Sequence, residues 1–308
     1  MADKLRGLIA ASHTPMHPDG SVHYEMIESQ VRLFRDNGMN GAFVCGTTGE
    51  GRLLNVEERK RVAACWLEGS RGDIPVVVHV GADCMDDIRE LARHAQEQGA
   101  FAISTTAPSF YRPADVSDLA QYCRAAADAA PKIPFYFYHI PSMTHVNFLM
   151  LDFLKAAENI IPTLAGIKFT HDDFVDLFAC QHYREGRYNL LSGRDEILLA
   201  ALSFGADGAV GSTYNYAAPL YQSLIQAFRE GRIEEARRLQ GFSMELVRLI
   251  KRFNEIAAGK AIMSCIGVDC GSVRPPLKPL SEDDRRIIEE GVETGSFRPY
   301  LCRFSPPA

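Results

Sequence analysis

Lys168 lies within residues 164–170 (Leu-Ala-Gly-Ile-Lys-Phe-Thr), a run that is otherwise typical of a buried strand. A lysine is rarely buried unless it is paired. Burial disfavours the ammonium form and favours the neutral amine, which is the nucleophile of Schiff-base chemistry. Because side chains alternate along a strand, Lys168 shares a face with Gly166 and Thr170. This stretch alone is equally compatible with a surface lysine at the end of a strand.

The glycine-rich stretch at residues 45–51 (Cys-Gly-Thr-Thr-Gly-Glu-Gly) follows another predicted strand. Its glycines allow backbone N–H groups to converge, and with the hydroxyls of Thr47 and Thr48 they could bind a carboxylate. The stretch lacks the Lys-Ser/Thr ending of a nucleotide-binding P-loop. A turn that needs positive φ would explain the glycines but not the two threonines. Asn55 and Glu58 predict a capping box on the helix that follows.

Tyr138 ends an aromatic strand, on the face that it shares with Tyr136. A phenol at the mouth of a strand can relay protons. A single tyrosine in an aromatic run is more commonly part of a core, and this alternative stays open here.

Two further stretches follow predicted strands. In Ser-Gly-Arg-Asp-Glu at residues 192–196, Asp195 and Glu196 precede a predicted helix at residues 197–203. They either cap this helix and complement its dipole or accept hydrogen bonds from a polyhydroxylated substrate. Gly-Ser-Thr-Tyr-Asn at residues 211–215 follows the last predicted strand, a position where barrels often bind anions on backbone amides.

Three histidines also lie near strand ends: His79, His139 and His171. Their spacing matches no metal-binding motif, and we therefore predict that the site holds no metal.

Eight short apolar runs alternate with helical patterns, and a glycine commonly separates a helix from the next run. The predicted strands lie at residues 8–11, 41–45, 75–80, 101–104, 133–138, 164–170, 188–192 and 207–211. This alternation predicts a parallel sheet, and eight units predict a closed (β/α)8 TIM barrel. An open doubly wound sheet is the alternative, but no Gly-x-Gly-x-x-Gly turn follows the first strand. In a barrel the chemistry lies at the carboxyl ends of the strands, where all these stretches fall.

From about Pro219 the pattern is helical, with predicted helices at residues 220–229, 233–257, 260–265 and 282–293. We predict a catalytic barrel at residues 1–222 and a C-terminal helical region at residues 223–308. Lys260 falls on the helical region, which we expect to keep it away from any strand end.

The composition of the 308 residues is that of an ordinary globular protein, with 46% hydrophobic and 23% charged residues. A net charge of −6 gives no electrostatic indication of nucleic acid or an anionic membrane surface as partner. No signal peptide or spanning segment is predicted. The eight scattered cysteines are typical of reduced thiols, which favours a cytoplasmic location.

Taken together, the motifs resemble the pyruvate-dependent class I aldolases of the N-acetylneuraminate lyase and dihydrodipicolinate synthase superfamily. The resemblance rests on Gly46-Thr-Thr-Gly-Glu50, Tyr138 with Ile140-Pro141, Gly166-Ile-Lys168, Gly193-x-Asp-Glu196 and Gly211-Ser-Thr-Tyr-Asn215. It spans residues 8 to about 279 in the expected order.

The resemblance implies a (β/α)8 barrel with a C-terminal helical bundle, assembled as a homotetramer. It implies that Lys168 forms an imine with pyruvate or the substrate ketone, so that no cofactor is needed. Tyr138 would be the proton shuttle. Thr47 and Thr48 would bind the carboxylate, and Thr47 would assist the proton relay.

Within the superfamily the chain looks closest to the N-acetylneuraminate lyases, particularly the animal-type sequences. This implies reversible cleavage of N-acetylneuraminate, a sialic acid, to N-acetylmannosamine and pyruvate, a reaction of carbohydrate metabolism. Thr170 would lie beside the imine. The glycerol-like tail of the sugar acid would meet residues of the last two loops: Gly193, Asp195, Glu196, Gly211 and Ser212.

Two departures weigh against a dihydrodipicolinate synthase. The synthases carry an arginine where this chain has Met143, and a tyrosine where it has Phe110, although Tyr111 adjoins that position. The alternatives are another pyruvate-dependent aldolase, acting on a 2-keto-3-deoxy sugar acid or an aromatic aldehyde adduct, and a non-catalytic barrel that binds keto acids.

Overall fold

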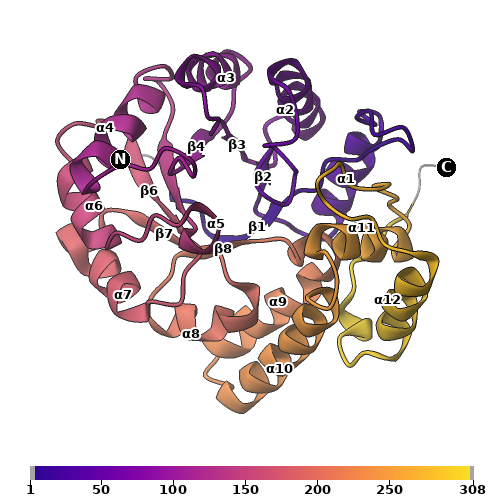
Figure 1. The fold of residues 1–308 in the computed structure, drawn as a ribbon. Coiled ribbons are helices and arrows are strands. Elements are labelled where there is room, and N and C mark those ends of the chain that lie inside the picture. The colour runs from indigo at the N-terminus through magenta and orange to yellow at the C-terminus, as the bar shows by residue number, and fades with distance from the viewer. Residues whose placement is uncertain (1–3, 306–308) are drawn as a thin grey trace.

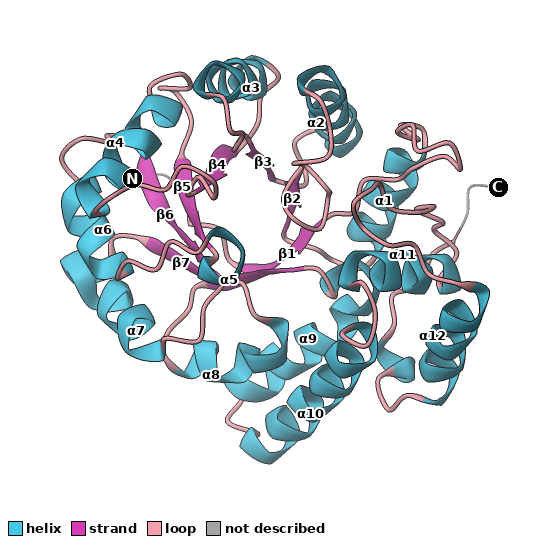
Figure 2. Cartoon of the chain, in the orientation of Figure 1, coloured by secondary structure: helices cyan, strands magenta, loops and turns pink. Residues whose placement is uncertain are grey.

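The computed structural model describes residues 4–305 and contains a closed barrel of eight parallel strands in sequential order (Figures 1 and 2). The strands are β1 (Gly7–Ala11), β2 (Gly41–Val44), β3 (Val76–His79), β4 (Ala102–Thr106), β5 (Phe135–His139), β6 (Leu164–Phe169), β7 (Asn189–Ser192) and β8 (Gly208–Gly211). Closure is direct, because β1 pairs with both β2 and β8. The predicted (β/α)8 barrel is confirmed.

Helices form a ring around the barrel, except for the short α5, which Figure 2 shows over the barrel. Those between strands are α1 (Met26–Asp36), α2 (Val56–Ser70), α3 (Met85–Glu97), α4 (Val116–Ala127), α5 (Pro141–Thr144), α6 (Met150–Ala157), α7 (Phe174–His182) and α8 (Leu198–Ser203). The predicted capping box starts α2: the Asn55 side chain accepts from the Glu58 N–H, and the Glu58 carboxylate accepts from the Asn55 N–H. This cap fixes where the loop after β2 ends.

The helical region comprises α9 (Tyr214–Arg229), α10 (Ile233–Ile250), α11 (Glu255–Cys265) and α12 (Glu282–Thr294). The single helix predicted at residues 233–257 is wrong, because the chain leaves the helix between α10 and α11. Asn254 restarts it as an N-cap, accepting from the Ala257 N–H at 3.1 Å. This break sets the direction of α11, which packs against α9, α10 and α12.

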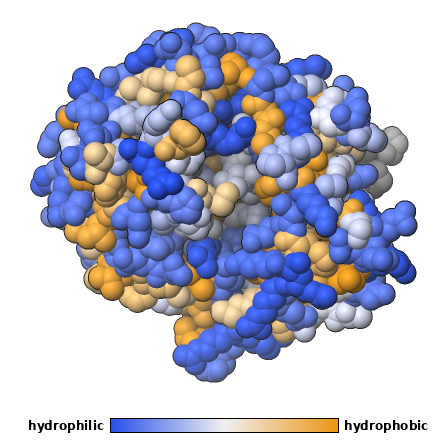
Figure 3. All heavy atoms as spheres, viewed as in Figure 1, coloured by the Kyte–Doolittle hydropathy of each residue, from blue (hydrophilic) through white to orange (hydrophobic). Residues whose placement is uncertain are grey.

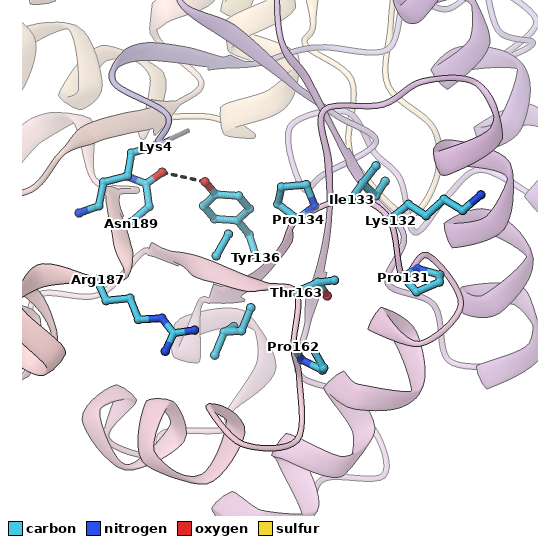
Figure 4. Close-up of a pocket in the computed structure, with 12 residues that line it drawn as sticks. Lys4, Pro131, Lys132, Ile133, Pro134, Tyr136, Pro162, Thr163, Arg187 and Asn189 are labelled. Carbon is cyan, nitrogen blue, oxygen red and sulfur yellow. Dashed lines mark hydrogen bonds between the residues drawn. The ribbon is translucent and has the colours of Figure 1, made fainter. Parts of the chain in front are cut away.

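The interior of the barrel holds its own apolar cluster, separate from the larger core between strands and helices. Phe43, Val77 and Tyr136 belong to it, and the Tyr136 hydroxyl donates to Asn189 Oδ1 at 2.8 Å. Figure 4 shows this hydrogen bond in a pocket of about 260 Å³ at the amino ends of β5, β6 and β7. That pocket lies at the opposite end of the barrel from the loops that are predicted to carry chemistry.

All eight cysteines are free thiols, and five of them are buried. Within residues 4–305, no helix is both long enough and apolar enough to cross a membrane.

Candidate active site

Lys168 and Tyr138 lie side by side at the carboxyl ends of β6 and β5, where they are register partners. Lys168 is 4% exposed, so it is not a surface residue. Its Nζ lies 3.9 Å from the centre of the Tyr138 ring and 4.3 Å from that of Phe43. Among residues 4–305, no carboxylate forms an ion pair with this amine. A buried amine without an anionic partner is unusual in a folded protein.

The Tyr138 hydroxyl reaches the loop after β2. It lies 3.5 Å from the Thr47 hydroxyl, and the ring packs edge-on against Phe43 and His79. Thr47 is exposed and Thr48 is partly buried. The phenol, the amine and a threonine hydroxyl therefore lie close together at the carboxyl ends of the strands.

The loop after β2 is held in a specific conformation. Cys45 and Glu50 have positive φ, and a Cβ at Gly51 would lie 1.8 Å from the Cys45 carbonyl oxygen. Only glycine fits at that close approach. The Thr14 hydroxyl donates to the Gly49 carbonyl at 2.6 Å. Thr47 and Thr48 are thus presented by a rigid backbone.

A buried ion pair anchors the same loop from outside the barrel. Lys260 of α11 lies 2.6 Å from Glu50, and both side chains are almost fully buried. Lys260 also donates to the Ser272 carbonyl at 2.6 Å, and the Arg274 N–H donates to the second Glu50 oxygen at 2.8 Å. Desolvation lowers the pKa of Lys260, and Glu50 opposes that shift. The expectation that Lys260 is remote from the strand ends is wrong.

Asp195 does not cap a helix. Its Oδ2 accepts from the backbone N–H and the hydroxyl of Thr213 at 3.0 and 2.6 Å, which ties the loop after β7 to the loop after β8. Burial raises its pKa, although the Thr213 hydrogen bonds oppose the shift. A Cβ at Gly211 would lie 1.8 Å from Asp195 Oδ1, so glycine is required there by close contact.

Glu196 is more accessible than Asp195, with 18% of its side chain exposed. Lys251, the residue directly after α10, lies 2.7 Å from Oε1, and Arg194 lies 3.2 Å from the same oxygen. Desolvation alone would raise its pKa, but the hydrogen bond from Lys251 and the charges around it lower it overall. The interpretation of Glu196 as a helix cap is also wrong, because α8 begins without a side-chain cap.

The remaining predicted residues line the junction of the last three loops. The Thr170 N–H donates to the His139 carbonyl at 2.8 Å, while its hydroxyl has no partner in the described chain. A Cβ at Gly193 would lie 1.8 Å from that hydroxyl oxygen. Asn215 donates to the carbonyls of Ala11 and Ser212, which holds the loop after β8 against β1.

A cavity of about 230 Å³ opens beside Thr47. Its walls are mainly apolar and include Ile140, Met143 and Ile256. Arg52 and His79 also line it, and sequence reasoning missed both as site residues. The face seen in Figure 3 is hollowed near the position of the barrel in Figure 1.

The three histidines near the strand ends pack against aromatic rings: His139 against His171, and His79 against Tyr138. Burial, followed by the charge of His171, lowers the pKa of His139 to about 3, which keeps its imidazole neutral at physiological pH. In residues 4–305 the one cluster of three potential metal ligands involves other residues and lies in the loop after β1.

The geometry can be compared with known proteins. The model of the dihydrodipicolinate synthetase family matches residues 4–294. The chain belongs to this family. The matched range includes every strand of the barrel and the lysine on β6.

Curated members of this family with similar sequences are lyases. The chain is 40% identical to N-acetylneuraminate lyase of Gallus gallus over 285 residues, covering 91% of this chain and 92% of the relative. It is 39% identical to that of Mus musculus, covering 96% and 93%. The structure of Proteus mirabilis N-acetylneuraminate lyase is 41% identical, with a TM-score of 0.94 and coverage of 96% and 100%.

The buried pair gives a test of what holds the site together. Lys260→Met should lower the free energy of unfolding by about 3 to 5 kcal/mol, because Glu50 then stays buried without its partner. Lys155→Met is the matched control: its pair with Asp152 is half exposed, and its loss should cost less than about 1 kcal/mol. Urea unfolding measures both. Equal losses in the two variants would contradict an anchoring role.

Proposed function

We propose that this protein is a class I aldolase that cleaves N-acetylneuraminate reversibly to N-acetylmannosamine and pyruvate. The observation that carries the proposal is the buried Lys168 amine, which faces Tyr138 without a carboxylate partner in the described chain. The similarity to N-acetylneuraminate lyases at 39 to 41% identity supports the choice of substrate.

In the proposed reaction, the neutral Lys168 amine attacks the C2 ketone of the open-chain sugar acid, and loss of water gives a protonated imine. The imine accepts the electron pair of the C3–C4 bond as this bond breaks. Tyr138, assisted by the substrate carboxylate, takes the proton of the C4 hydroxyl, so that N-acetylmannosamine leaves as the aldehyde. Protonation of the resulting enamine at C3 and hydrolysis release pyruvate and restore the amine.

The lysine itself supplies the electron sink, and we therefore propose that neither a metal nor an organic cofactor takes part. Thr47 and Thr48, with the backbone N–H groups of their loop, would bind the carboxylate and fix the orientation of the imine. The rigid conformation of this loop supports that role.

The tail of the sugar acid would lie over the loops after β7 and β8. Oε1 of Glu196 lies close to two cations, and the partly exposed carboxylate can also accept from a substrate hydroxyl. Ser212 and Thr170 would add hydroxyl contacts. Asp195 would act mainly by holding the two loops together, with its free Oδ1 toward Gly211.

One observation favours a second candidate. The cavity beside Thr47 has mainly apolar walls, with Met143 in the place of the synthase arginine. An aldolase that condenses pyruvate with an apolar or aromatic aldehyde would use such a wall. Release of pyruvate from a panel of sugar acids and aldehyde adducts decides between the two substrate classes.

We also propose that the protein is a cytoplasmic homotetramer. Phe110 and Tyr111, on the loop after β4, are 79% and 85% exposed and pack edge-to-face on each other. Two adjacent exposed aromatic rings favour contact with a second copy. The proposed division into a barrel at residues 1–222 and a helical region at residues 223–308 places the boundary within α9.

The first test is covalent trapping. Incubation with pyruvate and borohydride should reduce an imine on Lys168 alone, because the amine of Lys260 is held by Glu50. Peptide mapping by mass spectrometry locates the adduct, and Lys168→Met should abolish it. An adduct on Lys260 would overturn the proposed role of Lys168, and the absence of any adduct would favour a non-catalytic keto-acid barrel.

The second test separates proton transfer from packing. Tyr138→Phe keeps the ring against Phe43 and His79 but removes the hydroxyl. It should fold normally, still form the pyruvate imine slowly, and lose roughly 100-fold or more in kcat. Steady-state kinetics with N-acetylneuraminate measures the loss. Near-normal turnover would assign Tyr138 to the core.

The third test concerns substrate choice. Glu196→Gln should lower kcat/KM for N-acetylneuraminate about tenfold or more, because a substrate hydroxyl loses its charged acceptor. Trapping of pyruvate at Lys168 should be unchanged. Lys251→Met is the matched control, since it removes one of the two ion pairs of Glu196 but keeps the carboxylate.

If the two variants lose the same activity, the ion pair matters and the substrate contact does not. Comparable activity of the native protein toward aspartate semialdehyde would overturn the lyase assignment and leave the broader aldolase class.

A further inference from the structure

The loop between β1 and α1 carries three metal-ligating side chains that the proposed reaction does not use: His17, His23 and Glu25. One donor atom from each lies within 4.8 Å of the others. We propose that these residues form a binding site for a divalent transition-metal cation of the zinc class, separate from the lysine site.

Backbone pairing brings the two histidines together. Met16 and Val22 form an antiparallel bridge, the His17 N–H donates to the Ser21 carbonyl, and the His23 N–H donates to the Pro15 carbonyl. The loop is therefore a small hairpin, with one histidine on each of its strands. The two imidazoles stack with ring centres 4.2 Å apart, and His23 Nε2 lies 4.0 Å from a Glu25 oxygen.

The hairpin is fixed before any ion binds. Gly20 at its tip has a φ of 83°, and its carbonyl accepts from Arg274 Nε at 2.8 Å. Arg274 is itself paired with Glu58 at 2.6 Å, and the Met16 N–H donates to the Cys270 carbonyl. A ligand set on a rigid backbone loses little conformational freedom when it closes on an ion.

The ligand atoms of His17, His23 and Glu25 are also accessible to an ion in solution. In residues 4–305, neither imidazole makes a hydrogen bond to the protein, apart from the long approach of His23 to Glu25. Both histidines are partly exposed, and the Glu25 side chain is 75% exposed. The buried histidines of the barrel, such as His79 and His139, do not have this access to an ion in solution.

The donor set selects the kind of ion. Two imidazole nitrogens and one carboxylate suit Zn²⁺ and its neighbours, whereas Mg²⁺ and Ca²⁺ prefer all-oxygen ligands. Metal–ligand bonds of about 2.0 to 2.2 Å require donors about 3.4 Å apart in a tetrahedral site. Small rotations of the exposed Glu25 side chain and of one imidazole ring bring the three donor atoms from their present separations, which are within 4.8 Å, to this distance. A water would complete the coordination.

A metal bound by His17, His23 and Glu25 would not be needed for imine formation, because none of these side chains belongs to the lysine site. The bound metal would hold the two arms of the hairpin together, and Arg274 connects the hairpin to Glu50 in the loop after β2. We therefore expect bound metal to raise the melting temperature without being required for activity.

The experiment is isothermal titration of the purified chain, first treated with chelator, with Zn²⁺ and separately with Mg²⁺. We expect one Zn²⁺ per chain and no binding of Mg²⁺. His17→Ala and His23→Ala should each weaken Zn²⁺ binding by at least about tenfold, and Glu25→Gln should weaken it less. His182→Ala is the matched control, since this exposed histidine lies on α7.

Exposed Cys84 and Cys265 are the competing ligands for a soft ion. The absorption spectrum with Co²⁺ separates the two cases, because thiolate ligation gives intense charge-transfer bands and imidazole ligation does not. Unchanged Zn²⁺ affinity in both histidine variants, or a thiolate spectrum, would overturn the proposal. A urea unfolding transition like that of the native protein shows that each variant is folded, whichever function the barrel has.

Discussion

The ion pair between Glu50 and Lys260 is the contact on which the site depends most. A buried charge that loses its partner is strongly destabilising, so the two side chains hold α11 and the loop after β2 in one arrangement. That loop presents Thr47 to Tyr138, and Tyr138 packs over the Lys168 amine. A contact between the helical region and the barrel therefore sets the position of groups that lie at the barrel axis.

The helical region supports the other half of the site in the same way. Gln240 and Ser243 of α10 donate to the Asp195 carbonyl, and Lys251 at the end of α10 pairs with Glu196. Short strands place reactive side chains at the mouth of the barrel, but the loops between them need external contacts to keep one shape. Contacts from the proposed helical region therefore reach loops on both sides of the candidate site.

The sequence predicts features that depend on local pattern. Strands follow from short apolar runs, and Lys168 stands out because its charge conflicts with the strand around it. Features that depend on distant partners were not predictable. Asp195 is held by Thr213 in the next loop, and Lys260 reaches Glu50 only because the helix breaks before Asn254. His17 and His23 meet across a hairpin that no histidine-spacing motif describes.

The two buried lysines show why burial alone does not identify a nucleophile. Both lie in apolar surroundings, but Lys260 has a carboxylate at 2.6 Å that stabilises its ammonium form. Lys168 faces aromatic rings instead, and in the described chain no carboxylate forms an ion pair with its amine. We therefore assign the proposed imine chemistry to the lysine whose amine has no carboxylate partner. By this criterion Lys168 is the proposed nucleophile, whereas Lys260 supports the structure of the candidate site.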